Sequence, residues 1–398
     1  MNQVSTKELS ALVEEKVDRL FPRLVEIRRH LHMNPELSNQ EFETTKRINE
    51  WLKEFGVPQL SANVRTGTAA EVTGNIEGPT IALRGDIDAL PIQEESPLPF
   101  RSKIDGVSHM CGHDVHTTIA LGAAIVLQEL REILPGNVRI LFQPAEETEG
   151  GATSMIAAGL LDGVSSIIGL HNSPDLPTGT IGIKDGFFMA SVDDFTLTIK
   201  GKGGHAAQPE RTIDPIVIGS AVVSQLQTIV SRNVPSKESA VISIGAFQAG
   251  ATNNVIPDKA ILKGTVRTSN EEVRQNVYET FKKVVTNTVT ALGGEVEIDY
   301  QFLIPAVVND AKITKVVRSA AVSVVGEEKT LVSEPSMGGE DFSHYQKVIP
   351  GSFVWLGSRN EEKGIIHGLH HPQFMVDEEA MKIGVKWMVQ SAFQLLKE

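Results

Sequence analysis

The chain has 398 residues, which favours two domains over one and allows a large hydrophobic core. Its formal net charge of −13 argues against nucleic acid or an anionic membrane as a main partner. One cysteine excludes an internal disulfide, residues 1–8 lack a signal peptide's apolar core, and no run of about 20 apolar residues exists, so we expect a cytoplasmic protein.

The first 170 residues alternate between helical and strand patterns. Apolar residues recur at helical spacing over residues 5–33, before Pro35, and over residues 41–55, before Gly56. Further on, the pattern predicts strands at 69–73, 80–83, 138–142 and 164–170, and helices at 115–130 and 153–158. This alternation predicts an α/β domain with a mixed, helix-covered sheet.

The pattern changes after about residue 186. There the sequence predicts strands at 191–200, 240–247, 259–267 and 295–300, and helices at 214–231 and 271–292. This β-α-β-β-α-β order matches a ferredoxin-like α+β domain. A helix at 310–325, a strand at 352–356 and a helix at 378–395 then return to the α/β style. We therefore expect one α/β domain, formed by residues 1–187 and 304–398, with a second domain inserted at 188–303.

Polar side chains follow the predicted strands of the α/β domain. Asp86 and Asp88 come after strand 80–83, the Glu146-Glu147 pair after 138–142, and His171 after 164–170. Two loops add more candidate ligands, namely Cys111, His113, Asp114, His116, His370 and His371. Because ligands bind beyond the carboxyl ends of strands in open α/β sheets, we expect these groups to converge on one edge.

This set suits two metal ions better than one tetrahedral ion, which needs three or four ligands. Thiolate and imidazole favour zinc, while the carboxylates leave manganese, cobalt or nickel open. In the Glu146-Glu147 pair, one carboxylate can bind metal while its neighbour accepts a proton from bound water, whose pKa falls towards ~7.

Each of these residues also has an ordinary interpretation. A lone histidine usually satisfies a local polar contact, a Glu-Glu pair is usually solvated, and a lone cysteine is usually buried and inert. Coincidence at the strand ends favours the metal for Cys111, His113, Glu147 and His171. The ordinary interpretation stays open for three other histidines, His109, His116 and His371. It is preferred for His30 and His32 in the first helix.

Eight motifs, in order along residues 25–385, give the sequence a specific resemblance. It resembles the amidohydrolase branch of the aminoacylase and carboxypeptidase metallohydrolases, which includes hippurate hydrolases, auxin–amino acid conjugate hydrolases and N-acyl-amino acid deacylases. The matching motifs are Arg28-Arg29-His30-Leu31-His32 with Pro35-Glu36-Leu37, Arg84-Gly85-Asp86-Ile87-Asp88-Ala89-Leu90-Pro91, Cys111-Gly112-His113-Asp114-Val115-His116-Thr117, Gln143-Pro144-Ala145-Glu146-Glu147, Gly203-Gly204-His205-Ala206-Ala207, Asn253-Asn254-Val255-Ile256-Pro257, Gly338-Gly339-Glu340-Asp341-Phe342 and Leu369-His370-His371-Pro372.

The resemblance implies two divalent metal ions and five ligands, Cys111, His113, Glu147, His171 and His370. Cys111 takes a position where other branches carry a bridging aspartate. Those branches have a histidine ligand where this chain has Arg84, so His113 is expected to supply the imidazole. Asp86 then orients a ligand. His370 is chosen over His371 because the family does not require histidine at the second position.

The resemblance also implies catalytic and substrate-binding roles. Glu146 is the general base and later the acid that protonates the departing amine. His205, in the inserted lid domain, stabilises the oxyanion and in the family can reach a partner subunit's site, so a homodimer is expected. Asn254 and Arg267 hold the substrate carboxylate, and Gly338 permits close backbone approach. A surface ion pair for Arg267 and an ordinary turn for Gly338 stay open.

The expected activity is hydrolysis of an N-acyl amino acid, with an acetyl, benzoyl or similar group, to a carboxylic acid and a free amino acid. A metallo-carboxypeptidase or dipeptidase would use the same ligands and differ only in the acyl-side pocket. A non-catalytic metal-dependent binding protein and a hydrolase with Cys111 as nucleophile are weaker alternatives.

Overall fold

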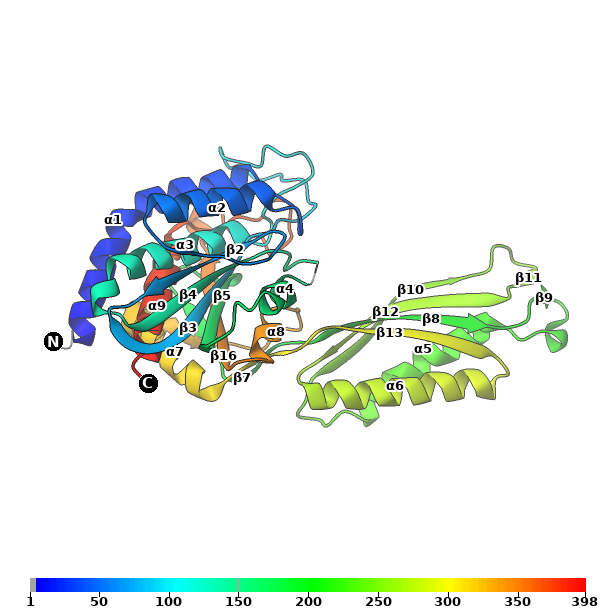
Figure 1. Ribbon diagram of the computed structural model, residues 1–398. Helices are drawn as coiled ribbons and strands as arrows, with labels where there is room; N and C mark the ends of the chain where they lie inside the picture. The colour runs from blue at the N-terminus through cyan, green and yellow to red at the C-terminus, as the bar shows by residue number, and fades with distance from the viewer. Residues whose placement is uncertain (1–4, 149) are drawn as a thin grey trace. The chain divides into compact units, whose positions relative to one another are not determined.

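A computed structural model describes residues 5–148 and 150–398 (Figure 1). Residues 1–4, part of the polar N-terminal segment noted above, lie outside this description. The chain forms two compact units. Unit 1 comprises the chain through Gly186, Val308–Glu334 and His344–Glu398, and unit 2 comprises Phe187–Val307 and Pro335–Ser343. In the described part of the chain, no helix has both the length and the apolar character needed to cross a membrane.

The helices expected in the α/β domain are present, and their ends lie within two residues of the predicted ones. They are α1 (Thr6–Met33), α2 (Phe42–Glu54), α3 (His113–Glu129), α4 (Gly151–Ala157), α7 (Ala311–Val325) and α9 (Glu379–Leu395), with a short α8 (Ser343–Gln346) that was not predicted. Local sequence explains their starts. Ser5 and Glu8 form a reciprocal capping box before α1, and the Asp310 carboxylate accepts the first free amides of α7.

The strands of unit 1 form one mixed eight-stranded sheet in the order β1-β2-β4-β3-β5-β16-β6-β15. Its strands are β1 (Gln59–Leu60), β2 (Thr68–Thr73), β3 (Ile76–Asp86), β4 (Pro135–Gln143), β5 (Val164–Pro177), β6 (Ile181–Ile183), β15 (Thr330–Val332) and β16 (Gly351–Arg359). The central strands β4, β3, β5 and β16 are parallel, so their carboxyl ends meet at one edge. The predicted α/β class is confirmed.

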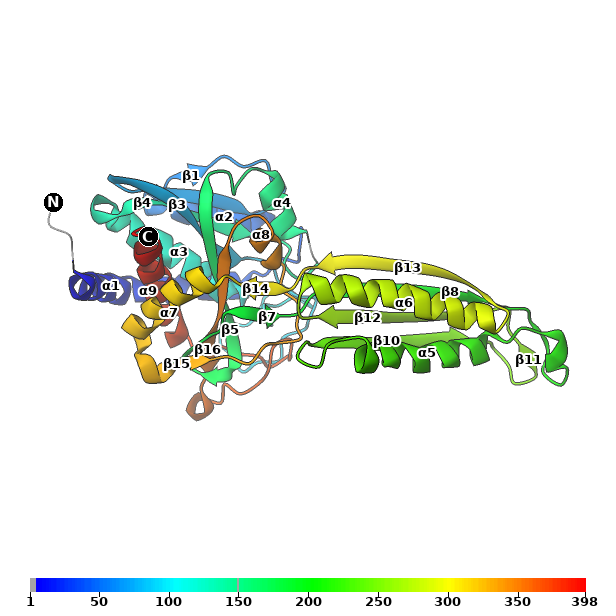
Figure 2. The same cartoon turned by 90° about the horizontal axis from the view of Figure 1, so that it is seen from below.

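Helix α3 is buried along almost its whole length, from His113 to Leu127. It packs against β3 and β4 on one side and against α1 and α9 on the other (Figures 1 and 2). A helix that is apolar all round needs such cover. The first turn of α3 is therefore held rigidly at the carboxyl end of β3.

Unit 2 is a four-stranded antiparallel sheet in the order β10-β12-β8-β13, which is the predicted ferredoxin-like arrangement. Its elements are β8 (Val192–Lys200), α5 (Pro215–Arg232), β10 (Ala240–Ala249), β12 (Lys259–Thr268), α6 (Glu271–Ala291) and β13 (Glu295–Ile304). Helices α5 and α6 pack together and cover one face of this sheet (Figure 2). A two-stranded ribbon, β9 (Gly204–His205) with β11 (Val255–Ile256), extends one end of unit 2. The chain passes from one unit to the other within β7 (Gly186–Met189) and again within β14 (Val307–Asn309).

Candidate metal centre

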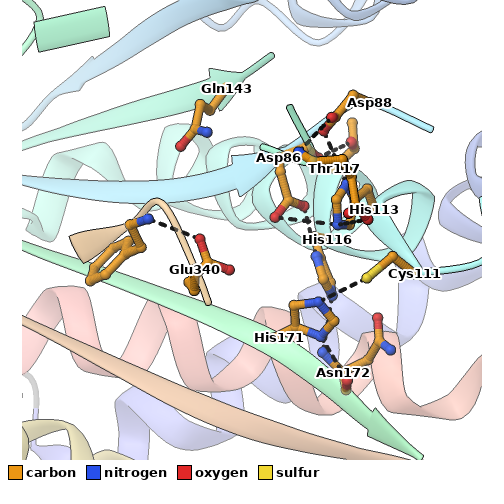
Figure 3. A network of polar contacts seen from close by, with 12 residues as sticks. Asp86, Asp88, Cys111, His113, His116, Thr117, Gln143, His171, Asn172 and Glu340 are labelled. Atoms are coloured by element: carbon orange, nitrogen blue, oxygen red, sulfur yellow. Dashed lines mark hydrogen bonds and ion pairs between the residues drawn. The ribbon is translucent and has the colours of Figure 1, made fainter. Parts of the chain in front are cut away.

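The carboxyl ends of β3, β4 and β5 and the first turn of α3 bring histidine, cysteine and carboxylate side chains together in unit 1 (Figure 3). Gly112 makes the entry into α3 possible. It has a φ of 91°, and a Cβ at this position would lie 2.1 Å from the Asn172 Oδ1 atom. Only glycine fits this turn, which places Cys111 and His113 on either side of it.

Cys111 and His171 face each other. The Cys111 Sγ atom lies 3.3 Å from the His171 Nε2 atom, and both residues are buried. The other ring nitrogen of His171, Nδ1, donates to the Asn172 carbonyl oxygen at 2.8 Å. The proton therefore resides on Nδ1, and Nε2 directs a lone pair towards the thiol. This is the tautomer that a metal ligand requires.

His113 is held in the same way, but by a carboxylate. Its Nδ1 atom lies 3.1 Å from the Asp88 Oδ1 atom, while its Nε2 atom is buried without a hydrogen-bond partner. Asp88 also accepts the backbone N–H of Glu147 at 3.0 Å. Asp88 was predicted to lie at the strand ends but was given no role. Its position two residues after Asp86 could have suggested that it also orients a ligand.

Glu147 and His370 complete the set. The buried Glu147 Oε1 atom has no hydrogen-bond partner, and it lies 3.7 Å from the His113 Nε2 atom and 3.5 Å from the His370 Nε2 atom. His370 has a φ of 63°, and its N–H donates to the Met110 carbonyl oxygen at 2.8 Å. The neighbouring His371 stacks on His367, and its Nδ1 atom accepts the Gln373 N–H.

Two groups of three ligand atoms share one member. Cys111, His113 and His171 form one group and Cys111, Glu147 and His370 the other, with the atoms of each group within 4.8 Å of one another. The unpartnered His113 Nε2 and Glu147 Oε1 atoms lie where a cation would complete their bonding. The donor set fits two divalent ions, which Cys111, His113, Glu147, His171 and His370 would hold.

The charges of the site agree with this fit. Burial and the neighbouring imidazoles hold the pKa of His171 well below its ordinary value, so its lone pair is available at neutral pH. Burial opposes charge on His113, but Asp86, Cys111 and Asp88 outweigh it and raise the His113 pKa well above its ordinary value. Burial and Glu147 raise the pKa of the Cys111 thiol well above its ordinary value. The raised thiol pKa argues against a free nucleophilic thiolate, and a metal ion bound here would have to displace the protons of Cys111 and His113.

Asp86, expected to orient a ligand, faces His116. The Asp86 Oδ1 atom accepts from His116 Nδ1 at 2.7 Å, and the buried Arg84 guanidinium donates to Asp86 Oδ2 at 2.5 Å. The Asp86 Oδ2 atom lies 3.9 Å from the His113 Nε2 atom. Burial would raise the Asp86 pKa, but Arg84, His113 and His116 hold it well below its ordinary value. Asp86 is thus a permanent anion beneath the site.

Asp114 belongs to a second buried network that joins α1 to α3. It lies 2.8 Å from Arg28 Nε and accepts from His32 Nδ1 at 2.9 Å, and the other nitrogen of His32 contacts Glu94 at 3.1 Å. The Asp114 Oδ2 atom thus faces α1. This network fixes the first turn of α3 against α1, and it accounts for the Arg28-to-His32 motif.

Four predicted residues lie in unit 2 as two separate pairs. His205 lies in β9 and Asn254 directly precedes β11, and the Ala206 N–H donates to the Asn254 carbonyl oxygen at 3.1 Å. Arg267 lies near the far end of β12, and its guanidinium is 3.5 Å from the Cβ position of Gly339, next to Gly338. The eight residues of β12 that precede Arg267 separate the pairs by about 30 Å.

Comparison with known proteins agrees with the site. Residues 82–394 match peptidase family M20/M25/M40. The chain is 47% identical over 386 residues to an N-acetylcysteine deacetylase of Bacillus subtilis, covering 96% of this chain and 99% of the relative. It is 36% identical over 402 residues to the IAA-amino acid hydrolase ILR1-like 4 of Arabidopsis thaliana, covering 100% of this chain and 90% of the relative.

A solved structure is similar as well. The crystal structure of a dinuclear metal-binding peptidase of the M20 family from Bacillus subtilis superposes with a TM-score of 0.84 at 43% identity, covering 96% of this chain and 99% of that one. Together with the paired donor groups around Cys111, this likeness supports two divalent metal ions. The chain therefore belongs to peptidase family M20/M25/M40 and is a metal-dependent hydrolase of amide bonds.

Proposed function

We propose that the protein hydrolyses N-acyl amino acids to a carboxylic acid and a free amino acid. The observation that carries the proposal is the Glu146-Glu147 pair at the end of β4. The Glu147 Oε1 atom lies close to the Nε2 atoms of His113 and His370. A Glu146 carboxylate oxygen lies within 4.8 Å of a Glu147 carboxylate oxygen and a His113 nitrogen. One carboxylate is thus available to bind metal and its neighbour to move a proton. The deacetylase and conjugate hydrolase named above support an N-acyl amino acid as substrate.

The proposed ligands are Cys111, His113, Glu147, His171 and His370. Two divalent ions held there supply Lewis acidity, which polarises an amide carbonyl and lets water lose a proton near neutral pH. Glu146 accepts that proton as the tetrahedral intermediate forms. It then returns the proton to the departing nitrogen, so that water is divided between the carboxylate and amine products. The metals proposed are zinc, manganese, cobalt or nickel, according to the mixed sulfur, nitrogen and oxygen donors.

Substrate recognition is proposed for residues of unit 2. His205 would donate to the developing oxyanion and Asn254 to the substrate carboxylate. Arg267, with the close backbone approach that Gly338 permits, would bind a carboxylate through paired N–H groups. Because about 30 Å of β12 separates the two pairs, one small substrate cannot touch both within one subunit.

We therefore propose a homodimer in which the β9–β11 ribbon supplies His205 and Asn254 to the partner's metal centre. Exposed apolar side chains near that ribbon support subunit association there. They are Ile216, Val217, Phe247 and Val255, which are 38–59% exposed.

A substrate panel tests the proposal. The protein, reconstituted in turn with each of the four metals, is assayed against N-acetyl and N-benzoyl amino acids and dipeptides. Faster turnover of the N-acyl amino acids supports the proposal. Faster turnover of dipeptides would identify a dipeptidase, and no turnover of any amide at full metal content would identify a binding protein.

A further inference from the structure

Glu41 has a fully buried carboxylate that does not serve its own helix. It occupies the N-cap position of α2, yet its side chain makes no capping hydrogen bond. The Glu36 carboxylate caps the helix instead, accepting the N–H groups of Glu43 at 3.2 Å and Thr44 at 2.8 Å. The Glu41 carboxylate is therefore available for another partner.

That partner is the backbone beside the general base. The Glu41 Oε1 atom accepts the Ala145 N–H at 2.8 Å, and its Oε2 atom accepts the Thr66 hydroxyl at 2.8 Å. Ala145 is fully buried and has a φ of 50°, in the left-handed region that disfavours residues with a Cβ. A buried charge-assisted hydrogen bond therefore holds a strained residue directly before Glu146.

The peptide on the other side of Glu146 is held by a second buried carboxylate. The Glu147 N–H donates to Asp88 Oδ2 at 3.0 Å, and the same oxygen accepts a hydrogen bond from the Ser38 hydroxyl at 2.7 Å. Glu146 thus lies between two backbone amides that carboxylates hold in place. Asp88 also contacts a proposed metal ligand, His113, whereas Glu41 reaches the site through the backbone of Ala145.

We propose that Glu41 is a positioning residue for catalysis: its carboxylate keeps Ala145 left-handed and thereby aims the Glu146 side chain at the reacting water. The inference rests on the proposed role of Glu146 as general base. Without the carboxylate, Ala145 relaxes towards ordinary φ values, the Cα–Cβ bond of Glu146 swings away, and proton transfer slows while metal and substrate still bind.

The test compares Glu41→Ala, Ala145→Gly and the double variant in the metal-loaded enzyme, with kcat, KM and metal content measured on one N-acetyl amino acid. Glu41→Ala is expected to lower kcat about 10- to 100-fold, with KM and metal content near wild type. Because glycine enters the left-handed region without a Cβ penalty, Ala145→Gly in the Glu41→Ala background is expected to restore kcat about 10-fold. Glu41→Gln keeps an acceptor for Ala145 and is expected to retain kcat within about threefold.

Thr66→Val is the matched control, because it removes the other hydrogen bond of Glu41 and leaves Ala145 untouched. It is expected to lower stability but not kcat. Wild-type kcat in Glu41→Ala, no recovery in the double variant, or an equal loss of kcat in Thr66→Val overturns the proposal.

A second variant covers the case in which Glu41→Ala does not fold. Glu41→Asp keeps the charge but withdraws it from the Ala145 amide by about one bond length. It should show the same loss and recovery of kcat, and wild-type kcat in this variant overturns the proposal. Glu146→Gln is assayed in parallel. If Glu146→Gln keeps full turnover, the assignment of Glu146 as general base fails. If Glu146→Gln is inactive while Glu41→Ala is fully active, only the positioning role of Glu41 fails.

Discussion

The backbone N–H of Asn172 donates to the Nε2 atom of His116 at 3.0 Å. Because the other nitrogen of that ring donates to Asp86, His116 has no lone pair left for a metal. His171 lies 4.5 Å away, measured between ring centroids, and its Nε2 lone pair faces the Cys111 sulfur. The N–H and carbonyl groups of Asn172 thus leave His171, but not His116, with a ring nitrogen that can bind a metal.

This difference predicts opposite effects on metal binding. His116→Gln should keep wild-type metal content and lose about 1–3 kcal/mol of unfolding free energy, because a buried hydrogen bond to a carboxylate is disturbed. His171→Gln should lose metal. Elemental analysis after dialysis, with thermal unfolding, makes the comparison. Equal metal loss in the two variants would contradict the assignment of roles.

Asp88 should matter to metal affinity although it is not a proposed ligand. Asp88→Ala removes the acceptor of His113 Nδ1 and of the Glu147 N–H, so both proposed ligands lose their orientation. We expect zinc affinity, measured by competition with a chelator, to fall about 10- to 100-fold. Asp105→Ala, at an exposed position, is the control and should bind zinc as wild type does. Unchanged affinity in Asp88→Ala would remove the orienting role.

Shared sites between subunits can be detected by mixing two inactive variants. Glu146→Gln retains His205, and His205→Ala retains Glu146, so a mixed dimer contains one complete site. Equal amounts, mixed after reversible dissociation, should recover roughly a quarter of wild-type turnover by random pairing. Either variant mixed with itself should stay inactive. Mixtures that gain no activity, although size measurements show exchange, would argue for sites completed within one subunit.

The buried His32 should make stability depend on pH. Burial and Arg28 lower its pKa, but Asp114 and Glu94 outweigh them, so the folded pKa is raised. A raised pKa stabilises the fold below the unfolded value of about 6.5, and this contribution disappears as pH rises through the folded pKa. The stability difference between wild type and His32→Gln should therefore be largest below about pH 6.5.

His30 on the same helix provides the control for that pH dependence. Burial and nearby cations, among them Arg47, lower its pKa. The fold therefore favours its neutral form, so the stability difference between wild type and His30→Gln should grow as pH rises from the lowered folded pKa to about 6.5 and stay level above that. Chemical denaturation across this range measures both slopes, and parallel slopes would contradict the assignment for His32.

Most of the fold could be predicted from periodicity, because long amphipathic helices and buried parallel strands leave strong patterns. The strands that were missed are β1, β6, β7, β9, β11, β14 and β15. They have two to four residues each, which is too few to form a pattern. The segment Pro335–Ser343 belongs to unit 2 through tertiary contacts, such as the Ala190 N–H to the Ser336 carbonyl oxygen, which no local signal reveals.

The candidate site was predictable in its residue types more than in its hydrogen bonding. The proximity of Cys111, His113 and His171 could be predicted, because the carboxyl ends of parallel strands lie at one edge of the sheet. The partner of each imidazole nitrogen depends on side-chain directions that spacing does not encode. Glu41 was missed for the same reason, since a glutamate at a helix start ordinarily signals a cap.

The central claim is that Glu146 moves the proton in a metal-dependent amide hydrolysis. The most direct test is the kcat of Glu146→Gln on an N-acetyl amino acid, measured at wild-type metal content. Because general acid–base catalysis contributes about 10²- to 10⁴-fold, we expect kcat to fall by at least about 100-fold while the metals remain bound. A Glu146→Gln enzyme with full metal content and wild-type kcat would contradict the account.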